Sequence, residues 1–216
     1  MYNLNKHIDI VYFKTLLWCH EVQVSAGGLG KVLDQMLREH PPGIMSLVHP
    51  MFGDVDYGPL DEHTRFTIVV DGKDQEIVVY TMQSELNGIT RVWYILSHEL
   101  FNERVKTAPY PSSMTKVKTL RYFSLWNQAV ALLLSELRPD VYHCMDYHAA
   151  MAPLYLSPET QLPVILVLHN ADYMGVLANP SKLFKFHFLT PIFQSVVNSV
   201  NLLYLVVDST SQRLTR

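Results

Sequence analysis

The feature that most constrains the fold is the order of segments near the N-terminus: an apolar run, a glycine loop and an amphipathic stretch. Residues 8–18 are apolar and β-branched or aromatic at many positions, which predicts a strand. The loop Ser25-Ala26-Gly27-Gly28 follows, and apolar residues at helical spacing between Leu29 and Leu37 then predict a helix that ends before residues 41–42, both proline. A strand, a glycine turn and a helix in this order open a Rossmann-like unit.

Later segments continue the alternation of strands and helices. Short apolar runs predict strands at residues 44–48, 140–143 and 163–168, and a stripe from Trp126 to Leu137 predicts a long helix that ends at Pro139. A further helix is expected over residues 146–156. We therefore predict the α/β class, with a Rossmann-like parallel sheet flanked by helices.

Three further runs indicate antiparallel strands. Phe66 to Val70, Ile77 to Tyr80 and Thr90 to Leu96 read as strands, and the turn-forming pair Asp71-Gly72 separates the first two. They predict a β-meander around residues 64–96 that is inserted in, or added to, the parallel sheet.

Composition bounds the class of protein and its partners. The chain has 216 residues, of which 49% are hydrophobic, so it can bury one substantial core. A formal net charge of -3 does not favour nucleic acid or an anionic membrane surface as partner. The two cysteines form no Cys-x-x-Cys pair, and we expect buried thiols in a reducing compartment. The apolar stretch at 192–207 is interrupted by polar residues, so a soluble chain, or one cut from a larger membrane protein, is expected.

Polar segments follow three of the predicted strands and are candidate binding regions. The loop at 25–30 suits a phosphate, because glycines allow close backbone approach and the next helix offers free N–H groups; a turn that only packs strand to helix is an equal alternative. At residues 143–148, Asp146 and His148 can hydrogen-bond a sugar, although spacing alone favours a helix cap and a polar neighbour.

The third segment follows the strand at 163–168. His169 and Asn170 are expected to face the same crevice as Asp146, and a simple turn is the alternative. Histidines and carboxylates do not occur at zinc-binding spacing, so no metal site is predicted. Because all three segments follow strands and would meet at one crevice, a shared binding site is the favoured interpretation.

Read together, these segments resemble the N-terminal domain of glycogen and starch synthases. Residues 140–156 look like that family's D-V-V-H-x-H-D-W-H-x-x-x-A-P-x-Y-L, residues 168–175 look like V-H-N-L-A-Y-Q-G, and the glycine loop resembles K-x-G-G-L. Tyr147, in place of Trp, is similar to the N-D-Y-H-G-A-L-A-P-L-Y-L of fungal alpha-1,3-glucan synthase, and residues 106–111 and 122–128 look like T-K-x-E-P-Y-P and Y-Y-S-A-W-N-Q of the same enzymes. The resemblance spans roughly residues 22–175.

The resemblance implies a two-domain GT-B fold, with residues 1–178 as a catalytic N-terminal domain and residues 179–216 as a divergent or truncated tail. Such enzymes move glucose from a nucleotide sugar to an alpha-glucan with retention. The donor would be UDP-glucose in the fungal branch, for cell-wall alpha-1,3-glucan, or ADP-glucose in the bacterial one. No cofactor is implied, and the expected location is cytoplasmic, or the cytosolic domain of a plasma-membrane synthase.

The resemblance also assigns residues to the site by matched position. Gly27 and Gly28 would contact the donor phosphates, with Ser25 beside them. The catalytic pair would be His169, against the donor glucose, and Asp146 nearby. The same wall of the crevice would be supported by His148 and Asn170.

Two departures from the family pattern leave an alternative open. Ser25 stands where the family has a lysine, and the second domain, with its nucleotide pocket and phosphate-binding groups, is absent from these residues. We therefore predict that this chain alone is inactive or nearly so. The alternative is a non-catalytic remnant that binds glucan or a partner synthase. A generic nucleotide-binding domain such as a dehydrogenase is disfavoured, because the loop lacks G-x-G-x-x-G.

Overall fold

The computed structural model of the chain describes the residues that form most of one sheet and the long helix that covers it. The described residues are 9–11, 18–19, 22–23, 46–86, 89–105, 114–145, 149, 151–160, 162–168 and 202–206. The helix expected after the glycine loop lies outside them.

The described strands form one large sheet and one small pair. The large sheet contains β1 (Asp9–Val11), β4 (Leu47–Pro50), β5 (Asp61–Val70), β6 (Lys73–Leu86), β7 (Ile89–Ser97), β8 (Tyr142–Met145), β9 (Val164–Leu168) and β10 (Leu202–Val206). The small antiparallel pair contains β2 (Trp18–Cys19) and β3 (Val22–Gln23). The described helices are α2 (Glu99–Asn102), α3 (Lys116–Leu137) and the 3₁₀ turns η2 (Ala152–Tyr155) and η3 (Pro158–Thr160).

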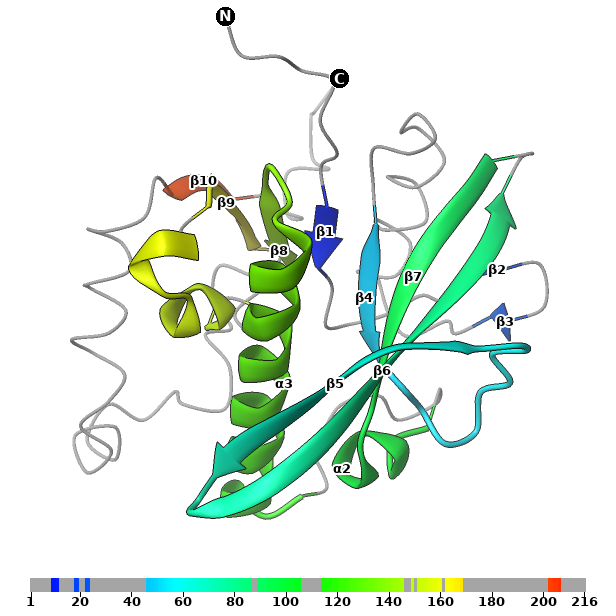
Figure 1. Cartoon of the computed structure of the whole chain (residues 1–216), viewed down its shortest axis with the longest axis horizontal. Helices are drawn as coiled ribbons and strands as arrows, with labels where there is room; N and C mark the ends of the chain where they lie inside the picture. The colour runs from blue at the N-terminus through cyan, green and yellow to red at the C-terminus, as the bar shows by residue number, and fades with distance from the viewer. Residues whose placement is uncertain are drawn as a thin grey trace, which may run out of the picture.

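The order of strands across the large sheet is β10-β9-β8-β1-β4-β7-β6-β5. From β10 to β7 every neighbouring pair is parallel. Along the chain, the parallel strands first move outward from β1 through β4 to β7, then return to the other side of β1 and continue through β8, β9 and β10 (Figure 1). This is the Rossmann strand order, so the predicted parallel α/β sheet is confirmed.

The predicted meander is also confirmed, and the structure shows how it joins the sheet. The long hairpin of β5 and β6 comes between β4 and β7 in the chain but lies outside β7 in space. Asp71 and Gly72 form its turn with φ of 54° and 70°, the left-handed values that a tight hairpin turn requires. The third strand of the meander, β7, belongs at the same time to the parallel part of the sheet because it pairs with β4.

Helix α3 covers one face of the sheet and supplies much of the core (Figure 1). It starts earlier than predicted, at Lys116, where the hydroxyl oxygen of Thr115 accepts a hydrogen bond from the N–H of Lys118 at 3.3 Å. It ends where predicted, since Arg138 adopts a left-handed φ of 52° directly before Pro139. The fully buried helix residues that pack in the core are Tyr122, Leu125, Trp126, Ala129, Val130 and Leu133.

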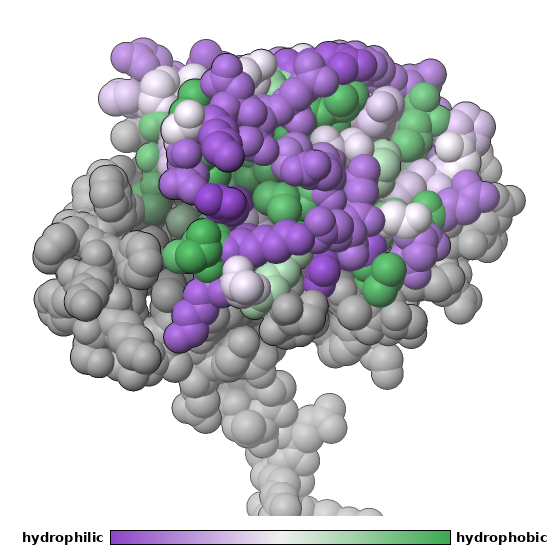
Figure 2. Space-filling model, turned by 90° about the horizontal axis from the view of Figure 1, so that it is seen from below, coloured by the Kyte–Doolittle hydropathy of each residue, from purple (hydrophilic) through white to green (hydrophobic). Residues whose placement is uncertain are grey.

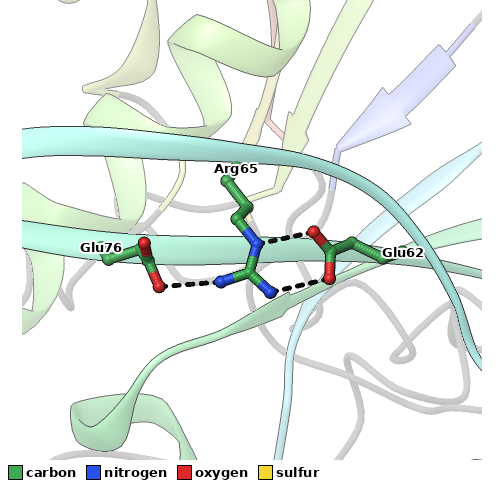
Figure 3. A network of polar contacts seen from close by, with 3 residues as sticks. All are labelled: Glu62, Arg65 and Glu76. Carbon is green, nitrogen blue, oxygen red and sulfur yellow. Dashed lines mark hydrogen bonds and ion pairs between the residues drawn. The ribbon is translucent and has the colours of Figure 1, made fainter.

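Polar side-chain contacts join the β5–β6 hairpin to α3 on the outside of this core. Arg121 on α3 pairs with Asp71 at the hairpin turn, and His63 of β5 lies 3.0 Å, Nε2 to Oε1, from Glu136 near the other end of the helix. These contacts hold the hairpin along the helix at both of its ends. On the hairpin itself, the half-exposed guanidinium of Arg65 bridges Glu62 and Glu76 (Figure 3).

The surface around this region is mostly polar. The face seen from below carries hydrophilic side chains with apolar ones scattered between them (Figure 2). Among the described helices, none is long and apolar enough to cross a membrane.

The helix expected over residues 146–156 takes a different form where the structure describes it. Ala149 is helical, and the next element is the 3₁₀ turn η2, with Pro153 at its start. A proline lacks the N–H that a longer α-helix would need at this point, which favours a short element. The strand expected at 140–143 is shifted to Tyr142–Met145.

Candidate functional site at the carboxyl edge of the sheet

The parallel strands β1, β8 and β9 end at one edge of the sheet. Their registers align Val11 of β1 with Cys144 of β8, and Cys144 with Leu166 of β9. Strand β8 then ends at Met145, and β9 ends two residues beyond Leu166. Strands β8 and β9 therefore end at the same edge, and in the sequence each is followed directly by a predicted site residue, Asp146 after β8 and His169 after β9.

The same edge contains the point at which the strand order reverses. From β1 the chain moves through β4 and β7 on one side, and β8 begins the other side as the second neighbour of β1. In open α/β sheets the loops after two such strands diverge and leave a crevice, where ligands bind. Here the two strands are β1, which precedes the glycine loop in the chain, and β8, which precedes Asp146.

The predicted site residues themselves lie outside the described residues. They are Ser25, Gly27, Gly28, Asp146, His148, His169 and Asn170. The strands that precede the second and third segments are described: β8 and β9 pair in parallel and end at the same edge. The roles assigned to the seven residues remain predictions.

Strand β8 presents its side chains alternately to the core and to the opposite face. Tyr142 and Cys144 are buried in the core cluster beneath α3. Burial raises the pKa of the Cys144 thiol and that of the Tyr142 phenol, so both groups stay neutral at physiological pH. The buried, free thiol of Cys144 agrees with the predicted burial of that cysteine. His143, 9% exposed, alternates with them and therefore belongs to the other face.

Sequence reasoning missed one polar residue at this edge, His49. It lies near the carboxyl end of β4, next to β1, and is fully buried. Neither ring nitrogen makes a hydrogen bond with the residues that the structure describes, although the Pro50 carbonyl is near enough to favour the protonated form slightly. Burial dominates and lowers the pKa of His49 to about 3, so the ring is neutral. The signal was present: His49 directly follows the apolar run at 44–48, as His169 follows the run at 163–168.

The chain after β4 is held closely against the end of β7 and α2. The N–H of Met51 donates to the carbonyl of Leu96 at 2.8 Å, and the N–H of Gly53 donates to the carbonyl of Arg104 at 2.9 Å. The ring of His49 packs edge-on against Phe52 with centroids 4.9 Å apart, and the N–H of Phe52 donates to the hydroxyl of Tyr57 at 2.8 Å. These hydrogen bonds and ring contacts hold the chain after β4 in a fixed position at this edge of the sheet. In the described part of the chain, no group of three or more His, Cys, Asp or Glu residues is arranged to hold a metal ion.

Comparison with known proteins decides the family. The model of the starch synthase catalytic domain matches residues 14–204, which include every strand from β2 to β9 and the first part of β10. The chain belongs to the starch synthase catalytic domain family. Membership confirms the resemblance on which the assignment of site residues rests, and it extends that resemblance beyond Gly175 to residue 204.

Within the starch synthase family, the relatives include fungal enzymes. The chain is 37% identical over 157 residues to the cell wall alpha-1,3-glucan synthase mok12 of Schizosaccharomyces pombe and 33% identical over 156 residues to mok13 of the same yeast. Each alignment covers 72% of this chain and 6% of the relative, so the chain spans a small part of those proteins. A glycogen synthase of Lactobacillus acidophilus is 25% identical over 166 residues, or 69% of this chain and 32% of the relative.

A solved structure confirms the fold. The catalytic domain of starch synthase IV from Arabidopsis thaliana, bound to ADP and acarbose, aligns with a TM-score of 0.56 and 20% identity. The alignment covers 78% of this chain and 34% of that one. The described sheet therefore has the architecture of one Rossmann-like domain of a GT-B fold. The division of the chain at residue 178 remains a prediction; the structure adds that β10, from beyond it, pairs with β9 in the same sheet.

Proposed function

We propose that the chain is the N-terminal domain of a retaining glucosyltransferase that extends an alpha-glucan from a nucleotide sugar. Alpha-1,3-glucan of a fungal cell wall is the proposed product and UDP-glucose the proposed donor, because the fungal relatives are named for that polymer and the motif around Tyr147 is of the fungal type. The domain would belong to the cytosolic part of a larger synthase whose second Rossmann-like domain completes the site.

The observation that carries this proposal is the reversal of strand order between β1 and β8. In open α/β sheets such a reversal leaves a crevice at the carboxyl edge, and β8 and β9, which directly precede two of the family's motif segments in the sequence, end at that edge. A sheet without the reversal would offer the same residues no common crevice. Family membership by itself supports the class of reaction, and the topology supports the place where it occurs.

The proposed roles follow from the charges that develop during transfer of the sugar. The departing nucleotide gains negative charge on its phosphates, which backbone N–H groups at Gly27 and Gly28 are suited to stabilise. The glucose ring gains positive, oxocarbenium-like character, which hydrogen bonds from His169 and the charge of Asp146 would stabilise on its other side. His148 and Asn170 would hold these groups in place.

A second candidate function is supported by one residue. Ser25 stands where the family pattern has a lysine, so a cation is missing from the proposed phosphate site. A domain without that cation would bind the donor weakly. It would then act as a non-catalytic subunit that holds glucan or a partner synthase.

Binding measurements on a full synthase that contains this chain and the second domain separate these two functions. We would titrate it with UDP-glucose, ADP-glucose and a soluble alpha-glucan by isothermal titration calorimetry. The glucosyltransferase proposal predicts binding of UDP-glucose that weakens about tenfold or more in His169→Ala or Asp146→Asn, since each removes a polar contact to the sugar. His63→Gln is the matched control, because His63 lies on the hairpin and pairs with Glu136. Glucan binding without any binding of nucleotide sugar would support the non-catalytic function instead.

Turnover tests the need for a second domain. With UDP-glucose and an alpha-glucan primer, we expect the chain alone to release UDP slowly or not at all, because one domain provides only one side of a GT-B site. The full synthase should form the new bond with retained configuration, which NMR of the product measures. Rapid turnover by the chain alone would contradict the proposed need for a second domain.

A further inference from the structure

We propose that Tyr142 is a positioning residue for the segment between β8 and η2. This inference rests on the proposed function, because that segment carries the candidate site residues Asp146 and His148. The argument depends on a hydrogen bond between Tyr142 and Ala149, both of which the structure describes.

The phenol of Tyr142 reaches along the chain to the far end of this segment. Its ring is fully buried in the core beneath α3, and its hydroxyl donates a hydrogen bond of 2.6 Å to the carbonyl oxygen of Ala149. The backbone of Tyr142 is fixed independently, since its N–H donates to the carbonyl of Pro163 at 2.9 Å and the residue pairs with Asp9 of β1. One rigid residue therefore sets the position of Ala149 relative to the edge of the sheet.

Both ends of the candidate segment are held in place: Met145 by strand pairing and Ala149 by the bond from Tyr142. Met145 is the last residue of β8, and Ala149 is fully buried together with Ala152 at the start of η2. Only residues 146–148 lie between these two fixed points. A short chain held at both ends has few conformations, so we infer that fixing Ala149 helps to position the segment that carries Asp146 and His148 in the sequence.

The hydroxyl of Tyr142 is not needed to fill the core. A phenylalanine would fill the same space in the core, and the family pattern has valine at this position of D-V-V-H. Burial keeps the phenol protonated, so it donates to Ala149 and does not exchange protons with a substrate. The inferred role is thus geometric: the hydroxyl fixes a carbonyl that would otherwise be buried without this donor.

Tyr142→Phe tests this role because it removes one oxygen and retains the ring. We would compare the chain and the variant by hydrogen–deuterium exchange with mass spectrometry, using peptides that span residues 145–152. We would also titrate the full synthase, with and without the substitution, with UDP-glucose. Tyr122→Phe is the matched control: it removes another fully buried tyrosine hydroxyl from the same core but leaves the bond to Ala149 in place. We expect about tenfold faster exchange over 145–152 in Tyr142→Phe alone, the effect of losing one buried hydrogen bond. Exchange in the β5–β6 hairpin should be unchanged.

The outcomes distinguish the positioning role from the proposed function. Unchanged exchange over 145–152 would overturn the positioning role, and so would faster exchange that extends equally over the hairpin, since that is a general loss of stability. Faster local exchange with about tenfold weaker binding of UDP-glucose supports both the positioning role and the donor site. Faster local exchange together with a full synthase that binds no UDP-glucose before or after the substitution keeps the positioning role and removes the proposed donor site.

Discussion

Replacing Gly53 with alanine tests how closely the chain after β4 must approach α2. A Cβ atom at this position would lie 2.2 Å from the carbonyl oxygen of Asn102. Because this oxygen belongs to the backbone, it cannot rotate away as a side-chain atom could. To reach even 3.0 Å, the two segments would have to separate by about 0.8 Å. That movement would strain or break the hydrogen bond from the Gly53 N–H to the carbonyl of Arg104, now 2.9 Å long.

The expected loss of stability combines two effects. Forced overpacking costs roughly 1–3 kcal/mol, and a lost backbone hydrogen bond costs roughly 0.5–1.5 kcal/mol. We therefore expect Gly53→Ala to lower the free energy of unfolding by about 3 kcal/mol. For a chain of this size, that lowers Tm by roughly 6–12 °C in thermal unfolding followed by circular dichroism.

Gly58→Ala is the matched control. Gly58 has a φ of +67°, but a Cβ there would meet nothing within 4 Å, so the cost is that of the left-handed conformation alone, about 1 kcal/mol. Equal melting of the two variants would show that steric contact with Asn102 is not what requires glycine at residue 53. A Gly53→Ala variant as stable as the original chain would refute the reasoning completely.

Three further predictions concern titration, reactivity and surface charge. Because burial depresses the pKa of His49 to about 3, the unfolded chain binds more protons below pH 6.5, and stability should fall with acid by about 1.4 kcal/mol per pH unit. His49→Phe should show a correspondingly shallower fall between pH 6.5 and pH 4.5 in denaturant titrations; an identical profile would contradict the buried, neutral ring. In a Cys19→Ser background, Cys144 should react with a thiol reagent at pH 8 only after unfolding, and prompt labelling of the native chain would refute its burial. Arg65→Ala should leave Tm unchanged at about 0.15 M salt, because all three members of the ion-pair network are exposed to solvent and their charges are screened; a clear drop in Tm would show that the network contributes to stability (Figure 3).

The sequence predicted the class of fold because its strands and helices have distinct patterns. The run at 163–168 is continuously apolar, as expected of a strand buried in a parallel sheet, and Asp71-Gly72 specifies the hairpin turn. The order of strands across the sheet was not predictable from such local patterns. It depends on which strands pair with β1, and β10 joins the sheet through residues 202–206, where the sequence had suggested only a tail.

The candidate site was predicted from motifs, and its supporting contacts were not. The motif residues around Asp146 and His169 are polar residues after apolar strands, a pattern visible in one dimension. The bond from Tyr142 to Ala149 joins residues seven positions apart and depends on packing beneath α3. The burial of His49 depends in the same way on the packing around it, which involves Phe52 and Tyr57. Such contacts arise from tertiary packing, on which local patterns carry little information.

Strand β5 forms one border of the described sheet, and its character has a consequence for how copies of this chain behave at high concentration. An open border of a sheet can recruit a strand from another molecule and start aggregation. Here the register shifts between Glu62 and Thr64, and Glu62 and Arg65 place charges along the strand. Irregular pairing and charge both discourage an added strand, so this border is poorly suited to growth of the sheet from one molecule into the next.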